Sequence, residues 1–338
     1  MVSVVCPFFN EEAVIATSVR TMCSALERMS EPWELILVND GSRDRSQTLA
    51  EEAAGNDPRV KVIGYAVNRG RGEAIRFGMA HATGAIVVTT EIDLSWGEDI
   101  VSRLVACFRE KPDADIVIAS PHLPNGGYRN VPLKRVLISK LGNMLIRWAL
   151  TRRLTMFTGM TRAYRSDRLA MLALEERGKE LHLEIINKAL ALDCTIYEIP
   201  AVLEWKDQTS KAGAKSKRRS STRLGKVAKT HLLFSFTVSP FKYMRVLSVI
   251  LSVAGGLTLA SALVVDGRTT ATAIALGGVL LILASLQVFI VGILAQQARH
   301  VQESLWRIQS ILLRSSSPEI WSAQATREAA SPTTQLAP

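Results

Sequence analysis

The sequence predicts an α/β domain with a mostly parallel sheet, followed by a two-helix membrane hairpin. Short runs rich in Val and Ile alternate with amphipathic helical stretches up to about residue 120. Such alternation is typical of a parallel sheet with right-handed crossovers. The hairpin is predicted from two long uncharged stretches near the end of the 338-residue chain, which is 48% hydrophobic and 21% charged.

The predicted strands and helices follow one another in a regular order. The strands are Val2–Cys6, Glu34–Val38, Val60–Tyr65, Ala85–Thr90 and Asp115–Ala119. Between them, apolar residues recur at three- and four-residue spacing, as in helices with one buried face. These helices are Glu12–Met29, Arg45–Ala54, Gly72–Ala82 and Glu98–Glu110. The later predictions are a helical pair over Leu133–Leu150, a helix over Leu181–Leu192, and strand-like Thr195–Trp205 with a break at Pro200.

Two stretches have the length and composition of membrane-spanning helices. Val246–Val265 is twenty residues without a charge and Ala271–Ala295 is twenty-five. Each can cross a hydrocarbon core about 30 Å thick; the alternative is a pair of buried core helices. Only Asp266–Thr270 connects them, so both flanks lie on one side of the membrane. Arg223–Tyr243 mixes basic and aromatic residues, as an interfacial helix does.

Positive charge is concentrated before the hairpin. The segment Lys206–Lys229 has nine basic residues against one acid, in a chain whose net charge is +10. The positive-inside rule places this segment, and with it the large N-terminal domain, in the cytoplasm of a multi-pass membrane protein. A basic segment beside a membrane span favours anionic lipid over nucleic acid as its partner. The tail from Ser315 is predicted to be disordered.

Acidic residues follow two of the predicted strands. Asn39-Asp40-Gly41-Ser42 comes after the second strand and Glu91-Ile92-Asp93 after the fourth. In an open parallel sheet, ligands bind outside the carboxyl ends of the strands. Asp40 can accept a hydrogen bond from a nucleotide base, and Glu91 with Asp93 can hold a divalent cation. These acids therefore indicate a nucleotide-sugar site, although Asp40 alone is also consistent with an ordinary turn.

Two further motifs follow strands. Asn68-Arg69-Gly70-Arg71-Gly72 is a glycine-rich turn whose two arginines open a helix, a place suited to phosphate oxygens; the alternative is a solvated loop. Pro7-Phe8-Phe9-Asn10-Glu11 follows the first strand, where acids also suit the first turn of a helix. Because all four motifs fall at strand ends on one edge, we favour a single binding site.

These motifs together resemble those of family 2 glycosyltransferases with the GT-A fold, in particular dolichol-phosphate mannose synthases and bacterial polyprenyl-phosphate glycosyltransferases. The resemblance covers roughly residues 2–220 and extends to the membrane hairpin. Its later parts are Lys134-Arg135 with Ser139 and Asn143, Thr158-Gly159-Met160, Glu184, Glu198-Ile199-Pro200 and Trp306-Arg307-Ile308.

The resemblance implies a role for each site residue. Pro7, Phe9, Glu11 and Asp40 would contact the nucleoside, and Glu91, Asp93 and Ser95 would hold Mg²⁺ or Mn²⁺ on the diphosphate. The donor site would also include Arg69, Arg71 and a late basic residue, for which Lys206, Lys211 and Lys217 remain alternatives. Arg135 and Ser139 would receive the acceptor phosphate, and together with Asp93 they are the predicted catalytic residues. A homo-oligomer is left open.

The sequence departs from the family pattern in three places, of which the loosely matched late basic motif is one. Glu91 stands where the family usually has Asp, one methylene shorter, so that coordination can fall mainly on Asp93. Ser120-Pro121-His122 replaces an arginine that often follows the fifth strand. The Gln-x-x-Arg-Trp block of processive synthases is not found, which favours a single transfer.

We therefore predict metal-dependent, inverting transfer of one hexose of the mannose or glucose type from a GDP- or UDP-sugar to polyprenyl phosphate. The transfer would take place at the cytoplasmic membrane face. The predicted domains are a glycosyltransferase domain at 1–220, juxtamembrane helices at 221–245, the hairpin at 246–295, and a helix with the tail at 296–338. The alternatives are another lipid or glycan acceptor, or a weakly catalytic nucleotide-sugar-binding membrane partner.

Overall fold

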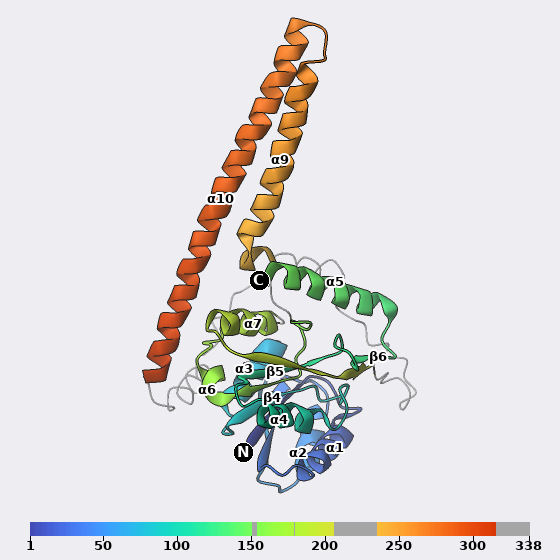
Figure 1. Cartoon of the computed structure of the whole chain (residues 1–338). Helices are drawn as coiled ribbons and strands as arrows, with labels where there is room; N and C mark the ends of the chain where they lie inside the picture. The colour runs from blue at the N-terminus through green and yellow to red at the C-terminus, as the bar shows by residue number, and fades with distance from the viewer. Residues whose placement is uncertain (151–153, 179, 206–234, 316–338) are drawn as a thin grey trace. The chain divides into compact units, whose positions relative to one another are not determined.

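The computed structural model describes residues 1–150, 154–178, 180–205 and 235–315 (Figure 1). The chain divides into two compact units. The first holds residues 1–144, 153–224 and 306–338, and the second holds 145–152 and 225–305. The basic segment, most of the predicted interfacial helix and the tail lie outside the described residues. The predicted domain boundaries therefore stay predictions.

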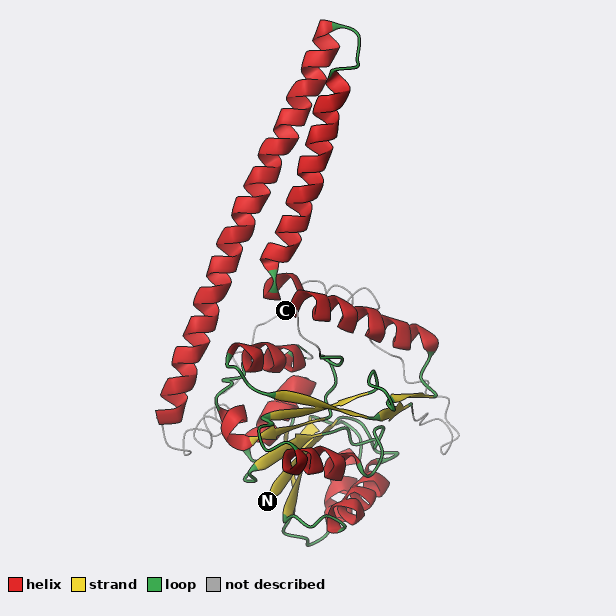
Figure 2. Ribbon diagram, in the orientation of Figure 1, coloured by secondary structure: helices red, strands yellow, loops and turns green. Residues whose placement is uncertain are grey.

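Within the described residues, the first unit contains a seven-stranded sheet in the order β3-β2-β1-β4-β7-β5-β8, with helices flanking it (Figure 2). The strands are β1 (Val2–Phe8), β2 (Trp33–Asp40), β3 (Val60–Tyr65), β4 (Ile86–Thr89), β5 (Ile116–Ser120), β7 (Arg162–Arg165) and β8 (Ile196–Pro200). All neighbouring pairs are parallel except those that β7 makes with β4 and β5. The predicted mostly parallel sheet is confirmed.

The hydrophobic pattern does not predict β7, and the reason is its first residue. Arg162 is fully buried, a rare position for a charged side chain. Its guanidinium donates to the carbonyl oxygens of His182 (2.9 Å) and Phe157 (2.5 Å). These hydrogen bonds satisfy part of a charge that would otherwise be costly to bury.

A second, two-stranded sheet pairs β6 (Gly127–Arg129) with β9 (Val202–Glu204) in parallel. Strand β8 ends at Pro200 and β9 begins two residues later. The predicted break at Pro200 is therefore confirmed. Pro lacks the backbone N–H that a continuing strand would need for its ladder.

Five helices of the first unit follow the predicted positions closely: α1 (Ile15–Glu27), α2 (Ser46–Ala54), α3 (Arg71–Ala80), α4 (Ile100–Glu110) and α7 (Leu181–Ala191). The short helix α6 (Ser166–Ala170) was not predicted. Helix α5 (Leu133–Leu150) is one continuous helix, so the predicted helical pair is wrong. No proline interrupts it, and Gly142 lowers helix propensity without ending the helix.

The second unit contains two long apolar helices, α9 (Pro240–Ala262) and most of α10 (Arg268–Ser315), which lie side by side (Figure 1). Gly255 and Gly278 let their backbones approach, because an added Cβ at either would lie 2.9 Å from the other's carbonyl oxygen. The Ser285 hydroxyl lies 3.0 Å from that of Ser248 and 2.6 Å from that of Ser252. Such small-residue contacts are typical of helix pairs in lipid.

Among the described residues, α9 and α10 are the helices long and apolar enough to cross a membrane. Their outer faces expose many large apolar side chains, including Ile250, Leu257, Leu283 and Val291. The connection is shifted from the predicted Asp266–Thr270, because α9 ends at Ala262 and α10 begins at Arg268.

Candidate active site

The loops after β1 and β2 are joined by hydrogen bonds. The backbone N–H of Asn10 donates to Ser42 Oγ (3.0 Å), and that of Glu11 donates to Ser46 Oγ (2.8 Å). Pro7 lies in β1, two residues before Phe9, a residue that is 41% exposed. The joined loops therefore present an apolar ring to solvent at the carboxyl edge of the sheet, where a nucleoside base can stack.

The carboxylate of Asp40 organises the next loop. Its Oδ1 accepts hydrogen bonds from the Tyr65 hydroxyl (2.8 Å) and from the backbone N–H groups of Arg69 (2.9 Å) and Gly70 (3.1 Å). Its Oδ2 accepts one from Asn68 Nδ2 (2.9 Å). Asp40 is buried, at 4% exposure, and its carboxylate binds mainly to the neighbouring loop. The nucleoside contact of Asp40 stays a prediction.

The two arginines of this loop have different surroundings. The Arg69 guanidinium stacks on Tyr65, with Cζ 4.8 Å from the ring centroid. Arg71 is the first residue of α3, and its Nη1 lies 3.5 Å from Glu91 Oε1 at the end of β4. The Arg71–Glu91 ion pair therefore joins the predicted phosphate site to the predicted metal site.

The segment between α6 and α7 packs against the start of α3. The backbone N–H of Glu73 donates to the carbonyl oxygen of Arg177 (2.9 Å). A Cβ on Gly72 would lie only 2.2 Å from the carbonyl oxygen of Gly178. Gly72 is thus needed for close backbone packing, in addition to any contact with a ligand.

The acid pair after β4 is held by its own loop. Glu91 Oε2 accepts hydrogen bonds from Ser95 Oγ (2.8 Å) and Trp96 Nε1 (3.2 Å), and Asp93 Oδ1 accepts one from the backbone N–H of Ser95 (3.0 Å). Burial and the nearby Asp93 raise the pKa of Glu91, while Arg71, Ser95 and Trp96 act in the opposite direction. A second positive charge at this site would relieve the repulsion between the two carboxylates.

These residues fit a divalent cation that binds together with a diphosphate. The described part of the chain has no cluster of three or more His, Cys, Asp or Glu side chains that could enclose a metal. Mg²⁺ is usually bound by one or two carboxylates with substrate phosphates and water, which Glu91 and Asp93 match. Lys211 and Lys217, the alternatives for a late basic donor residue, lie outside the described residues.

The predicted acceptor arginine is linked to the metal loop through β9. Arg135 lies in the first turn of α5, and its Cζ is 4.2 Å from the Trp205 ring centroid. The preceding residue, Glu204, donates its backbone N–H to the carbonyl oxygen of Ser95 (2.7 Å). Strand β9 thus connects the loop of Asp93 to the residue on which Arg135 stacks.

Ser139 lies in a polar cluster that the sequence analysis missed. His122 Nε2 is 3.4 Å from Ser139 Oγ, 3.2 Å from the Tyr128 hydroxyl and 3.2 Å from Asn143 Nδ2. His122 follows β5, at the position where the resemblance implies an arginine. This position is the sequence signal that could have indicated a role for His122 in the site. The structure brings this histidine to the side chain predicted to receive the acceptor phosphate.

Two glutamates of the family motifs bind backbone N–H groups. Glu198 accepts hydrogen bonds from the N–H groups of Thr155 and Met156, and Glu184 accepts them from residues 175–176. Carboxylates that bind successive N–H groups fix the conformation of a loop. Both therefore shape the segments around the site.

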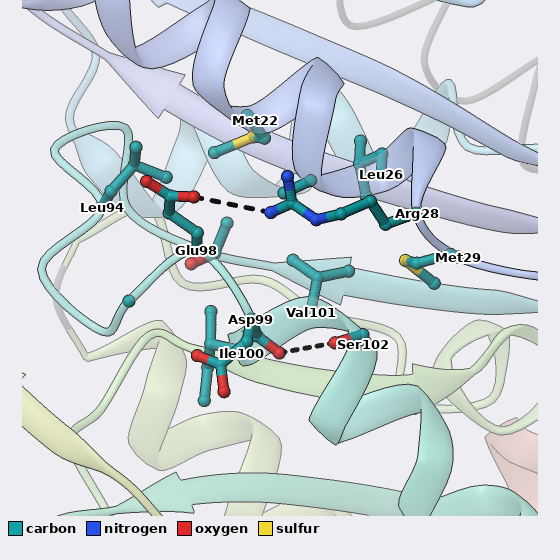
Figure 3. A pocket seen from close by; sticks show the side chains of 13 residues that line it. Met22, Leu26, Arg28, Met29, Leu94, Glu98, Asp99, Ile100, Val101 and Ser102 are labelled. Carbon is teal, nitrogen blue, oxygen red and sulfur yellow. Dashed lines mark hydrogen bonds and ion pairs between the residues drawn. The ribbon is translucent and has the colours of Figure 1, made fainter.

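A cavity of about 80 Å³ lies between α1 and the start of α4 (Figure 3). Met22 and Leu26 line it from α1, Met29 from just after α1, and Leu94 from the loop that follows Asp93. None of the predicted site residues lines this cavity. The cavity therefore lies beside the loop that follows Asp93 and is separate from the predicted donor site.

The sequence matches known proteins over its first half. Residues 3–170 match the model of glycosyl transferase family 2. The chain is 36% identical over 179 residues to an undecaprenyl-phosphate 4-deoxy-4-formamido-L-arabinose transferase of Pectobacterium atrosepticum, and to its counterpart in Pectobacterium carotovorum, covering 52% of each chain. The chain thus spans about half the length of the curated relatives it matches.

The fold is similar to that of a solved glycosyltransferase. Glucosyl-3-phosphoglycerate synthase from Mycobacterium tuberculosis, in complex with Mn²⁺, UDP-glucose and phosphoglyceric acid, superposes with a TM-score of 0.54. The match covers 70% of this chain and 79% of the synthase at 19% sequence identity. At this identity the similarity concerns the fold.

Proposed function

Since this chain belongs to glycosyl transferase family 2 and has the GT-A fold, we propose that it transfers one sugar from a nucleotide-sugar to polyprenyl phosphate. The main support is the meeting of four motifs at one edge of the sheet, where Arg71 contacts Glu91. The curated relatives, which are named for transfer to undecaprenyl phosphate, support this acceptor.

The donor would lie along the carboxyl edge of the sheet. The base would stack on Phe9 and donate to Asp40, and the diphosphate would accept hydrogen bonds from Arg69 and Arg71. Glu91 and Asp93 would hold a divalent cation against the diphosphate. When bound, this cation would stabilise the charge on the departing nucleoside diphosphate.

The acceptor explains why no general base is needed. An alcohol must lose a proton before it attacks, whereas a phosphate monoester has a second pKa near 6 and is largely dianionic at neutral pH. The protein must instead hold this dianion in line with the anomeric carbon. Arg135 would supply positive charge and Ser139, together with His122, would supply hydrogen bonds. Inversion at the sugar is proposed from family membership.

The membrane helices suit an amphiphilic acceptor. Helices α9 and α10 expose apolar faces and are long enough to span a bilayer. A hairpin would leave both flanks on one side, and the basic segment beside it favours the cytoplasmic side. The head group of polyprenyl phosphate would then lie in the interface next to the glycosyltransferase domain.

A panel of donors tests the proposal. The full-length protein in detergent is incubated with polyprenyl phosphate, Mg²⁺ or Mn²⁺ and a set of GDP- and UDP-hexoses, and the lipid product is identified by mass. The panel also includes a 4-deoxy-4-formamido-L-arabinose nucleotide, because the curated relatives are named for that sugar. We expect one hexose per lipid phosphate.

Two outcomes would favour the alternatives. Transfer to a diacylglycerol or a glycan, but not to polyprenyl phosphate, would show another acceptor. Metal-dependent nucleotide binding without transfer to any acceptor would show a binding partner. In an active enzyme, Asp93→Asn should lower turnover by several orders of magnitude and Glu91→Asp should be much milder; near-normal turnover of Asp93→Asn would contradict the metal assignment.

A further inference from the structure

Arg71 forms an ion pair with Glu91, one of the two carboxylates proposed to hold a cation. Its Nη1 lies 3.5 Å from Glu91 Oε1, and the two side chains are 47% and 28% exposed. Ser95 donates to both carboxylates, from its Oγ to Glu91 Oε2 (2.8 Å) and from its backbone N–H to Asp93 Oδ1 (3.0 Å), so the two negative charges lie close together and repel each other. Without a ligand, the Arg71 guanidinium therefore supplies positive charge to the pair.

The length of Glu91 makes this contact possible. Its Oε2 is held by the Ser95 hydroxyl and the indole N–H of Trp96, while Oε1 faces Arg71. An aspartate here would be one methylene shorter, and its carboxylate would lie about 1.5 Å nearer the backbone. It could not keep all three contacts without movement of the loop. Glu91, the residue that departs from the family pattern, is thus also the residue that forms the ion pair with Arg71.

A divalent cation and a guanidinium cannot share these carboxylates without repulsion, because like charges a few ångströms apart repel strongly. A nucleoside diphosphate changes the balance, since its oxygens can bind both cations at once. Arginine is well suited to such a change of partner, because its planar guanidinium matches both carboxylate and phosphate oxygens.

We propose that Arg71 is a resident counter-ion of the Glu91–Asp93 pair, and that a divalent cation replaces it there much more readily when a nucleoside diphosphate is bound. This inference rests on the proposed function, because it takes the donor to be a nucleotide-sugar. Metal binding and nucleotide binding are then coupled, and each strengthens the other by the same factor.

The test measures metal binding rather than activity. Mn²⁺ binding to the full-length protein in detergent is followed by electron paramagnetic resonance, without nucleotide and with saturating UDP or GDP. The wild type should bind Mn²⁺ weakly alone and much more tightly with nucleotide. Arg71→Gln should bind Mn²⁺ alone more tightly, within the range of about 5- to 150-fold that is typical of coupled sites. The enhancement by nucleotide should shrink accordingly.

Arg69→Gln is the matched control. It removes the same charge from the same loop, but its guanidinium stacks on Tyr65 and does not pair with Glu91. It should leave the affinity for Mn²⁺ alone within about twofold of wild type, since screening weakens charge effects at a distance. Both variants alter partly exposed side chains, and thermal unfolding checks that their folds are intact.

The outcomes separate the inference from the proposed function. If Mn²⁺ binds wild type with nucleotide but Arg71→Gln does not bind Mn²⁺ alone more tightly, the counter-ion role is overturned and the metal site stands. If Arg69→Gln tightens Mn²⁺ binding as much as Arg71→Gln, the effect is general electrostatics and the specific pair is overturned. If wild type binds no Mn²⁺ even with both nucleotides, the proposed metal-dependent function fails, and the inference with it.

Discussion

Glu34 joins three segments of the glycosyltransferase domain, and its removal should destabilise the fold. Its Oε1 accepts hydrogen bonds from Ser3 Oγ (2.5 Å) and from the backbone N–H and hydroxyl of Thr83 (both 2.7 Å), and its Oε2 accepts one from Lys61 Nζ (2.8 Å). Burial alone would raise its pKa, but the hydrogen bonds from Lys61, Ser3 and Thr83 outweigh burial and lower the pKa to about 2.

The size of the effect follows from proton linkage. A pKa lowered from 4.5 to about 2 corresponds to about 3 kcal/mol of folding free energy at neutral pH. The Lys61 side chain is 42% exposed, so solvent screening reduces this to about 2–3 kcal/mol. Because the pKa of Glu34 is lower in the folded state, its contribution is complete above about pH 5. It is lost as the pH falls from about 4.5 towards 2.

Glu34→Gln should therefore lower the free energy of unfolding by about 2–3 kcal/mol at pH 7. The measurement is urea denaturation of the full-length protein in detergent, followed by tryptophan fluorescence at pH 7, 5 and 3. The difference between variant and wild type should narrow by more than half from pH 7 to pH 3. The control is Glu98→Gln, since the Glu98–Arg28 pair is more than half exposed on both sides and should contribute less than about 1 kcal/mol. The reasoning would be refuted if Glu34→Gln and wild type had the same free energy of unfolding at pH 7. It would also be refuted if the difference between their free energies of unfolding did not change with pH.

Three other substitutions test the site and the hairpin. Gly72→Ala places a Cβ 2.2 Å from the carbonyl oxygen of Gly178, so it should raise the KM for the nucleotide-sugar at least tenfold; an unchanged KM would contradict the packing role. Arg135→Ala should raise the KM for polyprenyl phosphate far more than that for the donor, and equal effects in steady-state kinetics would indicate a solvated arginine. Gly255→Leu should lower the melting temperature in detergent because Gly278 lies against it, whereas Gly256→Leu should not, since nothing lies within 4 Å of its Cβ position.

The parallel strands β1 to β5 of the large sheet could be predicted because each is a short apolar run with a turn after it, whereas β6 of the small sheet was not predicted. Strand β7 could not be predicted, since Arg162 and Arg165 make its four residues look like a solvated turn. Its burial depends on carbonyl oxygens of Phe157 and His182, which no local pattern brings together. The error over α5 has a simpler origin, because its apolar residues fit one long helix as well as two short ones.

The predicted donor residues that the structure describes lie at or after the ends of strands at one edge of the sheet, whereas Arg135 and Ser139 lie in α5 and Lys211 and Lys217 lie outside the described residues. The partners of these residues were not predictable. Asp40 looked like a ligand for a base, and the structure shows that its first role is to hold the turn at Arg69 and Gly70. The pairing of Arg71 with Glu91 joins residues twenty positions apart, one at the start of α3 and the other in the loop after β4. Residue types and strand ends are local properties, whereas such contacts depend on the packing of the whole domain.

The antiparallel strand β7 has a consequence for synthesis on the ribosome. The order β3-β2-β1-β4 can be completed once about 90 residues have emerged, but the outer edge of β4 pairs only with β7. At about 5–20 residues per second, the roughly 75 residues between them take about 4–15 s to appear. During this time β4 is an open edge, and β5 has no place in the sheet because it also joins through β7. A nascent chain that stalls before Arg165 would thus expose a strand edge able to pair with another chain.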